Sequence, residues 1–175
     1  MVSTQVIKVT PALAVMTPMA LATFSHDMFN MCGGYASDTK AFLSKPYLYC
    51  VSIELGLKAA ILAVDCNDES KKLIKSLGHN LISTYNCFKE HYETDLFDNS
   101  DIITIEMINP YFRKKGLEYF TPEVLMAMMR GFKDLPSLKL LHQAAAKVDA
   151  FTQKNDLFVE ANSSVKPNRG IIAFV

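Results

Sequence analysis

The chain has 175 residues, 50% of them apolar and 21% charged, which predicts one globular domain with a substantial core and excludes a disordered protein. Its formal net charge is zero, so the chain lacks the basic composition of a dedicated nucleic-acid-binding protein. Any contact with nucleic acid must therefore come from a local patch of basic side chains.

The first elements lie before residue 47. We expect residues 3–10 to form an edge strand or an extended arm, because they are rich in β-branched side chains. The first helix is predicted to begin at Pro11 or Pro18, each preceded by an N-capping threonine, and to end near Met31 before Gly33-Gly34. Residues 35–46 are expected to be a loop. The predicted apolar stripe of the helix comprises Leu21, Phe24, Met28 and Met31.

Residues 47–64 are nearly all apolar, and we predict that they form the central helix of the fold. The alternation of polar residues at 52–58 also fits a strand, but the length of the run and its alanines favour a helix. Glu54 and Lys58 are four residues apart and would pair on one face. A row of small residues on a neighbouring face would let another helix approach closely: Ser52, Gly56, Ala60 and Ala63.

The same run is long enough to cross a membrane, but its two central charges would make that costly. The stretch after Lys8 has some features of a secretory signal, yet Pro11 and Pro18 interrupt it. We therefore expect a cytoplasmic protein with no membrane association.

After a turn, residues 69–77 are predicted to form a short helix that stops at Gly78. A second amphipathic helix follows, with His79 at its N-terminus and a stripe of Leu81, Tyr85, Phe88 and Tyr92. Ser100-Asp101 would cap a further helix, although its β-branched residues leave a strand open as an alternative. Asn109-Pro110 is expected to end that segment.

Residues 111–120 are predicted to be an aromatic and basic connection, and Thr121 would begin another helix. Ser137 would open the last long helix, whose stripe comprises Leu138, Leu141, Ala145, Val148 and Phe151. The tail, residues 157–175, ends in an apolar segment at 171–175 that would add a short strand or dock on a partner. The short loops predict a single all-α domain, an up-and-down bundle of four to five main helices with short terminal β segments.

The four cysteines, at positions 32, 50, 66 and 87, form no zinc or redox motif, and we expect free thiols. Glu90, His91, Glu93 and Asp95 are metal-ligand types, but adjacent residues face different ways on a helix, so no metal site is predicted. The sequence contains no glycine-rich phosphate loop and no recognisable nucleophile–histidine pattern. We therefore predict no cofactor.

Two short motifs resemble the HEPN superfamily of helical-bundle domains. The first is Ile53-Glu-Leu-Gly-Leu-Lys-Ala-Ala60, and the second is Leu77-Gly-His-Asn-Leu81, in which Asn80 replaces the usual Asp. The aromatic and basic residues 111–120 also resemble some members, and the resemblance covers roughly residues 12–152.

The resemblance implies a four- or five-helix up-and-down bundle, often a homodimer, with links to RNA. Many members are ribonucleases of toxin–antitoxin and phage-defence systems, and others are inactive RNA- or nucleotide-binding modules. The ribonucleases carry an arginine followed, after four to six residues, by a histidine. None of Arg113, Arg130 and Arg169 has a histidine at that spacing, so nuclease activity is not implied.

The candidate ligand-binding residues are Glu54, Lys58, His79, Asn80, Arg113, Lys114 and Lys115. Glu54 and Lys58 would position a phosphate or a histidine, or would form a purely structural ion pair. His79, at a helix N-terminus, would meet an anionic ligand, or would cap the helix and bind Glu54. The basic residues 113–115 would grip a phosphate backbone beside stacking aromatics, or would form a solvated turn.

Three functions remain open. The leading one is a non-catalytic module for RNA, nucleotide or protein binding. The second is an RNA-cutting or nucleotide-transferring enzyme with His79 and Glu54 at its site. The third is a purely structural interaction protein.

Overall fold

The structure, a computed structural model, describes residues 17–33, 44–119 and 135–154. Every regular element in these ranges is a helix, as an all-α bundle requires. The expected terminal strands at 3–10 and 171–175, the helix from Thr121 and the start at Pro11 lie outside the described residues.

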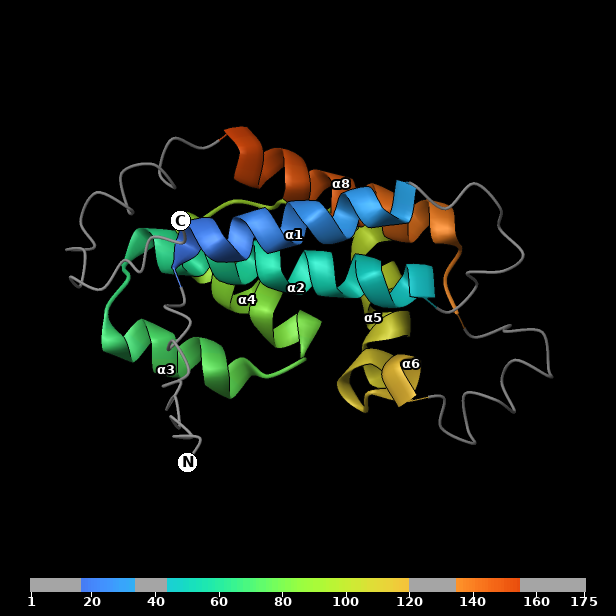
Figure 1. The fold of residues 1–175 in the computed structure, drawn as a ribbon, viewed down its shortest axis with the longest axis horizontal. Helices are drawn as coiled ribbons and strands as arrows, with labels where there is room; N and C mark the ends of the chain where they lie inside the picture. Colours follow the sequence, from blue (N-terminus) through green and yellow to red (C-terminus); the bar gives the residue numbers. More distant parts are fainter. Residues whose placement is uncertain (1–16, 34–43, 120–134, 155–175) are drawn as a thin grey trace, which may run out of the picture.

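Helix α2 (Ser44–Val64) occupies the middle of the bundle. It packs against α1 (Pro18–Gly33), α8 (Leu138–Lys154) and α4 (Leu81–Tyr92), and Figure 1 shows α1, α2 and α8 side by side. Helix α5 (Asn99–Arg113) packs on α4 and α8, while the shorter α3 (Asp68–Leu77) and α6 (Gly116–Tyr119) lie at the periphery. The prediction of an all-α helical bundle is thus confirmed.

The central helix is confirmed, although it begins at Ser44 and so includes Pro46, which was expected in a loop. Proline is tolerated in a first helical turn because its missing N–H would have no partner there. By length and composition alone α2 could cross a membrane, but 72% of its most apolar window is buried inside the bundle. It is therefore the core helix of the described fold.

The predicted row of small residues does allow close helix packing. A Cβ atom on Gly56 would lie 2.3 Å from Cγ1 of Val148 on α8 and 2.9 Å from Oγ of Ser25 on α1. The Ser25 hydroxyl also donates to the Ser52 carbonyl oxygen over 2.8 Å. Three helices therefore meet at this row.

The predicted apolar stripe of α1 is wrong for two members. Phe24 and Met31 are 56% and 47% exposed. The buried residues of α1 are Pro18, Leu21, Ala22, Ser25 and Cys32. Helix α1 presents small side chains to the small residues of α2, and this rotates the larger side chains toward solvent.

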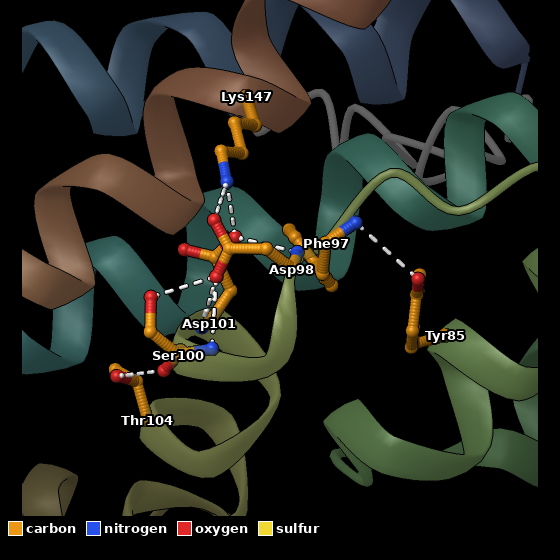
Figure 2. A network of polar contacts seen from close by, with 7 residues as sticks. All are labelled: Tyr85, Phe97, Asp98, Ser100, Asp101, Thr104 and Lys147. Carbon is orange, nitrogen blue, oxygen red and sulfur yellow. Dashed lines mark hydrogen bonds and ion pairs between the residues drawn. The ribbon is translucent and has the colours of Figure 1, made fainter.

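Helix α5 is confirmed as a helix, but its N-cap is Asp98 and not Ser100-Asp101. Asp98 Oδ1 accepts from the backbone N–H groups of Ser100 and Asp101, and the Asp101 carboxylate accepts from the Asp98 N–H over 3.0 Å. Lys147 on α8 donates to both carboxylates, as Figure 2 shows. This capping box therefore fastens α5 to α8.

The prediction that Asn109-Pro110 ends this segment is wrong, because α5 continues to Arg113. Pro110 cannot donate to the carbonyl of Glu106, but both residues are exposed, so water can bind that carbonyl. Phe112, which is 3% exposed, holds the last turn against the core. Residues 111–113 are therefore helical and not part of a connection.

The other predicted helices in the described ranges are confirmed with small shifts, whereas residues 116–119, expected in a connection, form the short helix α6. Helix α3 begins at Asp68 and stops before Gly78, and α4 buries Leu81, Tyr85 and Phe88. The Ser137 hydroxyl accepts from the Leu140 N–H at the start of α8. The predicted stripe of α8 is buried at Leu141, Ala145 and Val148 and partly buried at Leu138 and Phe151.

Candidate functional site

The motif around His79 forms a tight turn between α3 and α4. Gly78 has φ +54°, a left-handed conformation that glycine adopts without a steric penalty. Its N–H donates to the Lys75 carbonyl, and the Asn80 N–H donates to the Leu77 carbonyl over 3.2 Å. The turn therefore places His79 at a fixed point just before α4.

Beneath this turn, Glu54 and Lys58 form the predicted ion pair, with 2.5 Å between Oε1 and Nζ. The Lys58 ammonium also donates to the Gly78 carbonyl oxygen over 2.7 Å. The other carboxylate oxygen of Glu54 lies 3.0 Å from Nδ1 of His79. One buried pair thus binds both the backbone and the imidazole of the turn.

This arrangement separates the candidate residues by role. Glu54 and Lys58 are only 5% and 7% exposed, whereas the His79 side chain is 48% exposed. Of the three, His79 is therefore the one that can meet a ligand directly. A carboxylate at Nδ1 favours the tautomer with hydrogen on that nitrogen, and this leaves Nε2 as an acceptor when the ring is neutral.

The N-cap of α4 is Asn80 and not His79. Its Oδ1 accepts from the Ser83 N–H and from Nδ2 of Asn109, both over 3.2 Å. Oδ1 of Asn109 in turn accepts from the Leu81 N–H over 2.9 Å. These contacts fix the orientation of the Asn80 amide and satisfy two amide groups at the helix N-terminus.

An open depression of about 300 Å³ lies over the turn, and Arg113 reaches it from the end of α5. Its lining residues are Ser76, Leu77, Gly78, His79, Asn80, Ser83 and Arg113. The depression thus combines the predicted residues His79, Asn80 and Arg113, although they come from distant parts of the sequence. Lys114 and Lys115 are exposed next to Arg113 but do not line the depression.

The aromatic residues near Arg113 do not form the predicted stacking surface in the part that is described. Phe112 is buried, and its ring meets the His79 imidazole edge-on, with 5.6 Å between centroids. Tyr111 is partly buried against the core. These two rings support the turn from inside and do not form a surface on which bases could stack.

Two of the metal-ligand types at 90–95, His91 and Asp95, make local contacts. His91 Nδ1 donates to the Cys87 carbonyl over 2.8 Å, and Lys89 forms an ion pair with Asp95 at 2.6 Å. Across the described ranges, no three His, Cys, Asp or Glu side chains gather in a way that could hold a metal ion.

Sequence reasoning missed Asn109 and Ser83. Asn109 precedes a proline, so it was interpreted as part of a helix end, and nothing in the local pattern links it to Asn80. Ser83 lies within a polar turn of α4, and only the fold shows that it faces the depression.

Comparisons with protein-family models, curated proteins and solved structures find no match to this chain.

Proposed function

We propose that this protein is a cytoplasmic, HEPN-like module that binds RNA or a nucleotide without cleaving it. The observation that carries the proposal is that His79, from the α3–α4 turn, and Arg113, from the end of α5, line one depression. A guanidinium and an imidazole are both suited to binding phosphate. The HEPN resemblance supports the nucleotide or RNA part of the proposal.

The electrostatics of the depression favour an anion. No acidic residue is among its lining residues, and the charge of Glu54 beneath it is balanced by Lys58. Arg113 is exposed and makes no ion pair within the described part of the chain. With Lys114 and Lys115 beside it, Arg113 supplies the local basic patch that a chain of zero net charge needs.

One observation favours the alternative, an RNA-cutting or nucleotide-transferring enzyme. The Glu54 carboxylate orients the His79 imidazole across 3.0 Å, an arrangement that also serves general-base catalysis. The chain lacks the arginine–histidine spacing of the ribonucleases, so we assign Glu54 the role of positioning His79 for binding.

The test is fluorescence anisotropy with a labelled single-stranded RNA across a salt series, followed by a gel of each sample. Contacts from Arg113, Lys114 and Lys115 predict a slope of log affinity against log salt of about −2. Arg113→Ala should weaken binding about tenfold, while Lys139→Ala, at an exposed lysine on α8, should not. Intact RNA supports a binding module, and cut RNA would establish the enzyme.

Absence of binding at low salt would contradict the ligand proposal and favour the third function, a protein-interaction module. Two side chains on α5 suit that role, because Ile103 and Met107 are 57% and 38% exposed.

We also propose a homodimer, on the basis of the resemblance alone. Light scattering that gives the mass of one chain would contradict the homodimer.

A further inference from the structure

Several polar groups that line the depression have no partner in the described part of the chain. The Oδ1 atom of Asn80 is used twice, by the Ser83 N–H and by Asn109, so its NH₂ group is the free end of the amide. Neither this NH₂ group, the Ser83 hydroxyl nor the Arg113 guanidinium has a hydrogen-bond partner among the described residues. Each is solvent-accessible and can donate to a ligand.

These donors surround a small site and not a long groove. The volume of about 300 Å³ is at the lower end of the range for small-ligand sites. The Ser76 hydroxyl donates to the Leu73 carbonyl oxygen and is therefore not available to a ligand. The available donors belong to Asn80, Ser83 and Arg113, and a protonated His79 would add a fourth. They come from the α3–α4 turn, from α4 and from α5, and therefore approach a bound group from several sides.

The number of donors distinguishes two kinds of phosphate. A terminal phosphomonoester has three non-bridging oxygens and a charge near −2 at neutral pH. An internal phosphodiester has only two such oxygens and a single charge. We propose that the depression takes a terminal phosphomonoester, with the NH₂ group of Asn80 as one of its donors; this inference rests on the proposed function above.

In this proposal Asn80 determines specificity. An aspartate at position 80 would accept the same hydrogen bonds from Ser83 and Asn109, so the cap of α4 would remain. It would nevertheless replace a donor by a carboxylate and place a negative charge against the phosphate. We therefore expect Asn80→Asp to weaken binding of the phosphorylated ligand while leaving the helix cap in place.

The test compares short, internally fluorescein-labelled RNAs of one sequence that carry a 5′-phosphate, a 3′-phosphate or no terminal phosphate. The full-length protein should bind at least one phosphorylated RNA about tenfold more tightly than the unphosphorylated RNA. Adenosine monophosphate should compete, whereas adenosine should not. Competition by the nucleotide without a preference among the RNAs would identify a free nucleotide as the source of the phosphate.

The outcomes separate this inference from the proposed function. Equal binding of all three RNAs, weakened by Arg113→Ala and without competition by the nucleotide, would overturn the terminal-phosphate inference and keep the RNA-binding proposal. No binding of any RNA or nucleotide would overturn both.

A variant pair tests the role of Asn80. Asn80→Asp should reduce the preference for the phosphorylated ligand at least tenfold, with a melting temperature close to that of the wild type. If Asn80→Asp does not fold, Asn80→Ser serves instead, because serine caps a helix without adding charge. A folded variant of either kind that binds phosphorylated RNA as tightly as the wild type would overturn the assigned role of Asn80.

Discussion

The ammonium group of Lys58 donates to the carbonyl oxygen of Gly78 across 2.7 Å, and this contact joins the central helix to the turn that carries His79. The same ammonium neutralises Glu54, whose second oxygen holds the imidazole. Because Lys58 and Glu54 are both buried, the stability of the core and the geometry of the candidate site depend on the same side chains.

Removing only one charge of this pair should be strongly destabilising. Lys58→Met leaves the Glu54 carboxylate buried without its partner, and we expect the free energy of unfolding to fall by roughly 3 kcal/mol or more. Urea denaturation measures the change. The double variant Glu54→Leu/Lys58→Met removes both charges and should recover much of that loss. A stability of Lys58→Met equal to that of the wild type would contradict the buried pair.

Gly56 should not tolerate even one additional methyl group. In Gly56→Ala the new Cβ would lie 2.3 Å from Val148 Cγ1, so α1, α2 and α8 would have to move apart. Overpacking of this kind costs about 1–3 kcal/mol. Gly33→Ala is the matched control, because a Cβ at Gly33 meets nothing within 4 Å, and it should be neutral or slightly stabilising. Thermal unfolding of both variants checks the contrast.

The capping box of α5 should make stability depend on acid pH. Hydrogen bonds from Lys147, and then from Ser100 and the Asp101 backbone, hold the pKa of Asp98 well below its usual value. A lowered folded-state pKa stabilises the protein above the ordinary carboxyl pKa of 3.8, and this contribution is lost as pH falls below it. Asp98→Asn keeps a capping residue but loses the charge.

Urea denaturation at a series of pH values from about 6 to 3 tests this dependence. The wild type should lose stability more steeply than Asp98→Asn below pH 4. Parallel pH profiles for the two proteins would show that the Asp98–Lys147 contact does not contribute to folding.

The expected free thiols are confirmed among the described residues, and their burial predicts which one reacts first. Burial raises the pKa of Cys32 to about 11 and also raises the pKa of Cys50 and of Cys87. Cys66 is only partly buried. An aromatic disulfide reagent at mildly alkaline pH should therefore modify one thiol quickly, and Cys66→Ser should abolish that fast phase. Persistence of the fast phase would place the reactive thiol elsewhere.

The sequence predicted elements best where one pattern dominates. The apolar run of α2 and the helical spacing of Leu81, Tyr85 and Phe88 in α4 required no knowledge of their neighbours. Phe24 was misplaced because the face of α1 that is buried depends on the small residues of α2, which lie far along the chain. Pro110 was interpreted as a helix end because a proline inside a helix leaves one backbone carbonyl without its hydrogen bond. The energetic cost of that loss depends on whether water reaches the carbonyl, and the sequence does not show this.

The candidate site was only partly predictable for a related reason. Glu54, Lys58 and His79 share short motifs, and the structure brings their side chains together as a connected group. The entry of Arg113 into the same depression depends on α5 continuing past Pro110, which the local rules for proline do not predict. The bond from Asn109 to Asn80 is likewise a consequence of packing between helices.

The most direct test of the proposed site is to observe the His79 imidazole while a phosphate ligand is added. The chain has four histidines, so nitrogen-15 spectra of their rings provide internal controls in one sample. With adenosine monophosphate, the resonance of His79 Nε2 should shift and saturate while those of His26, His91 and His142 stay unchanged. No shift at His79, or equal shifts at all four rings, would contradict a phosphate site over this turn.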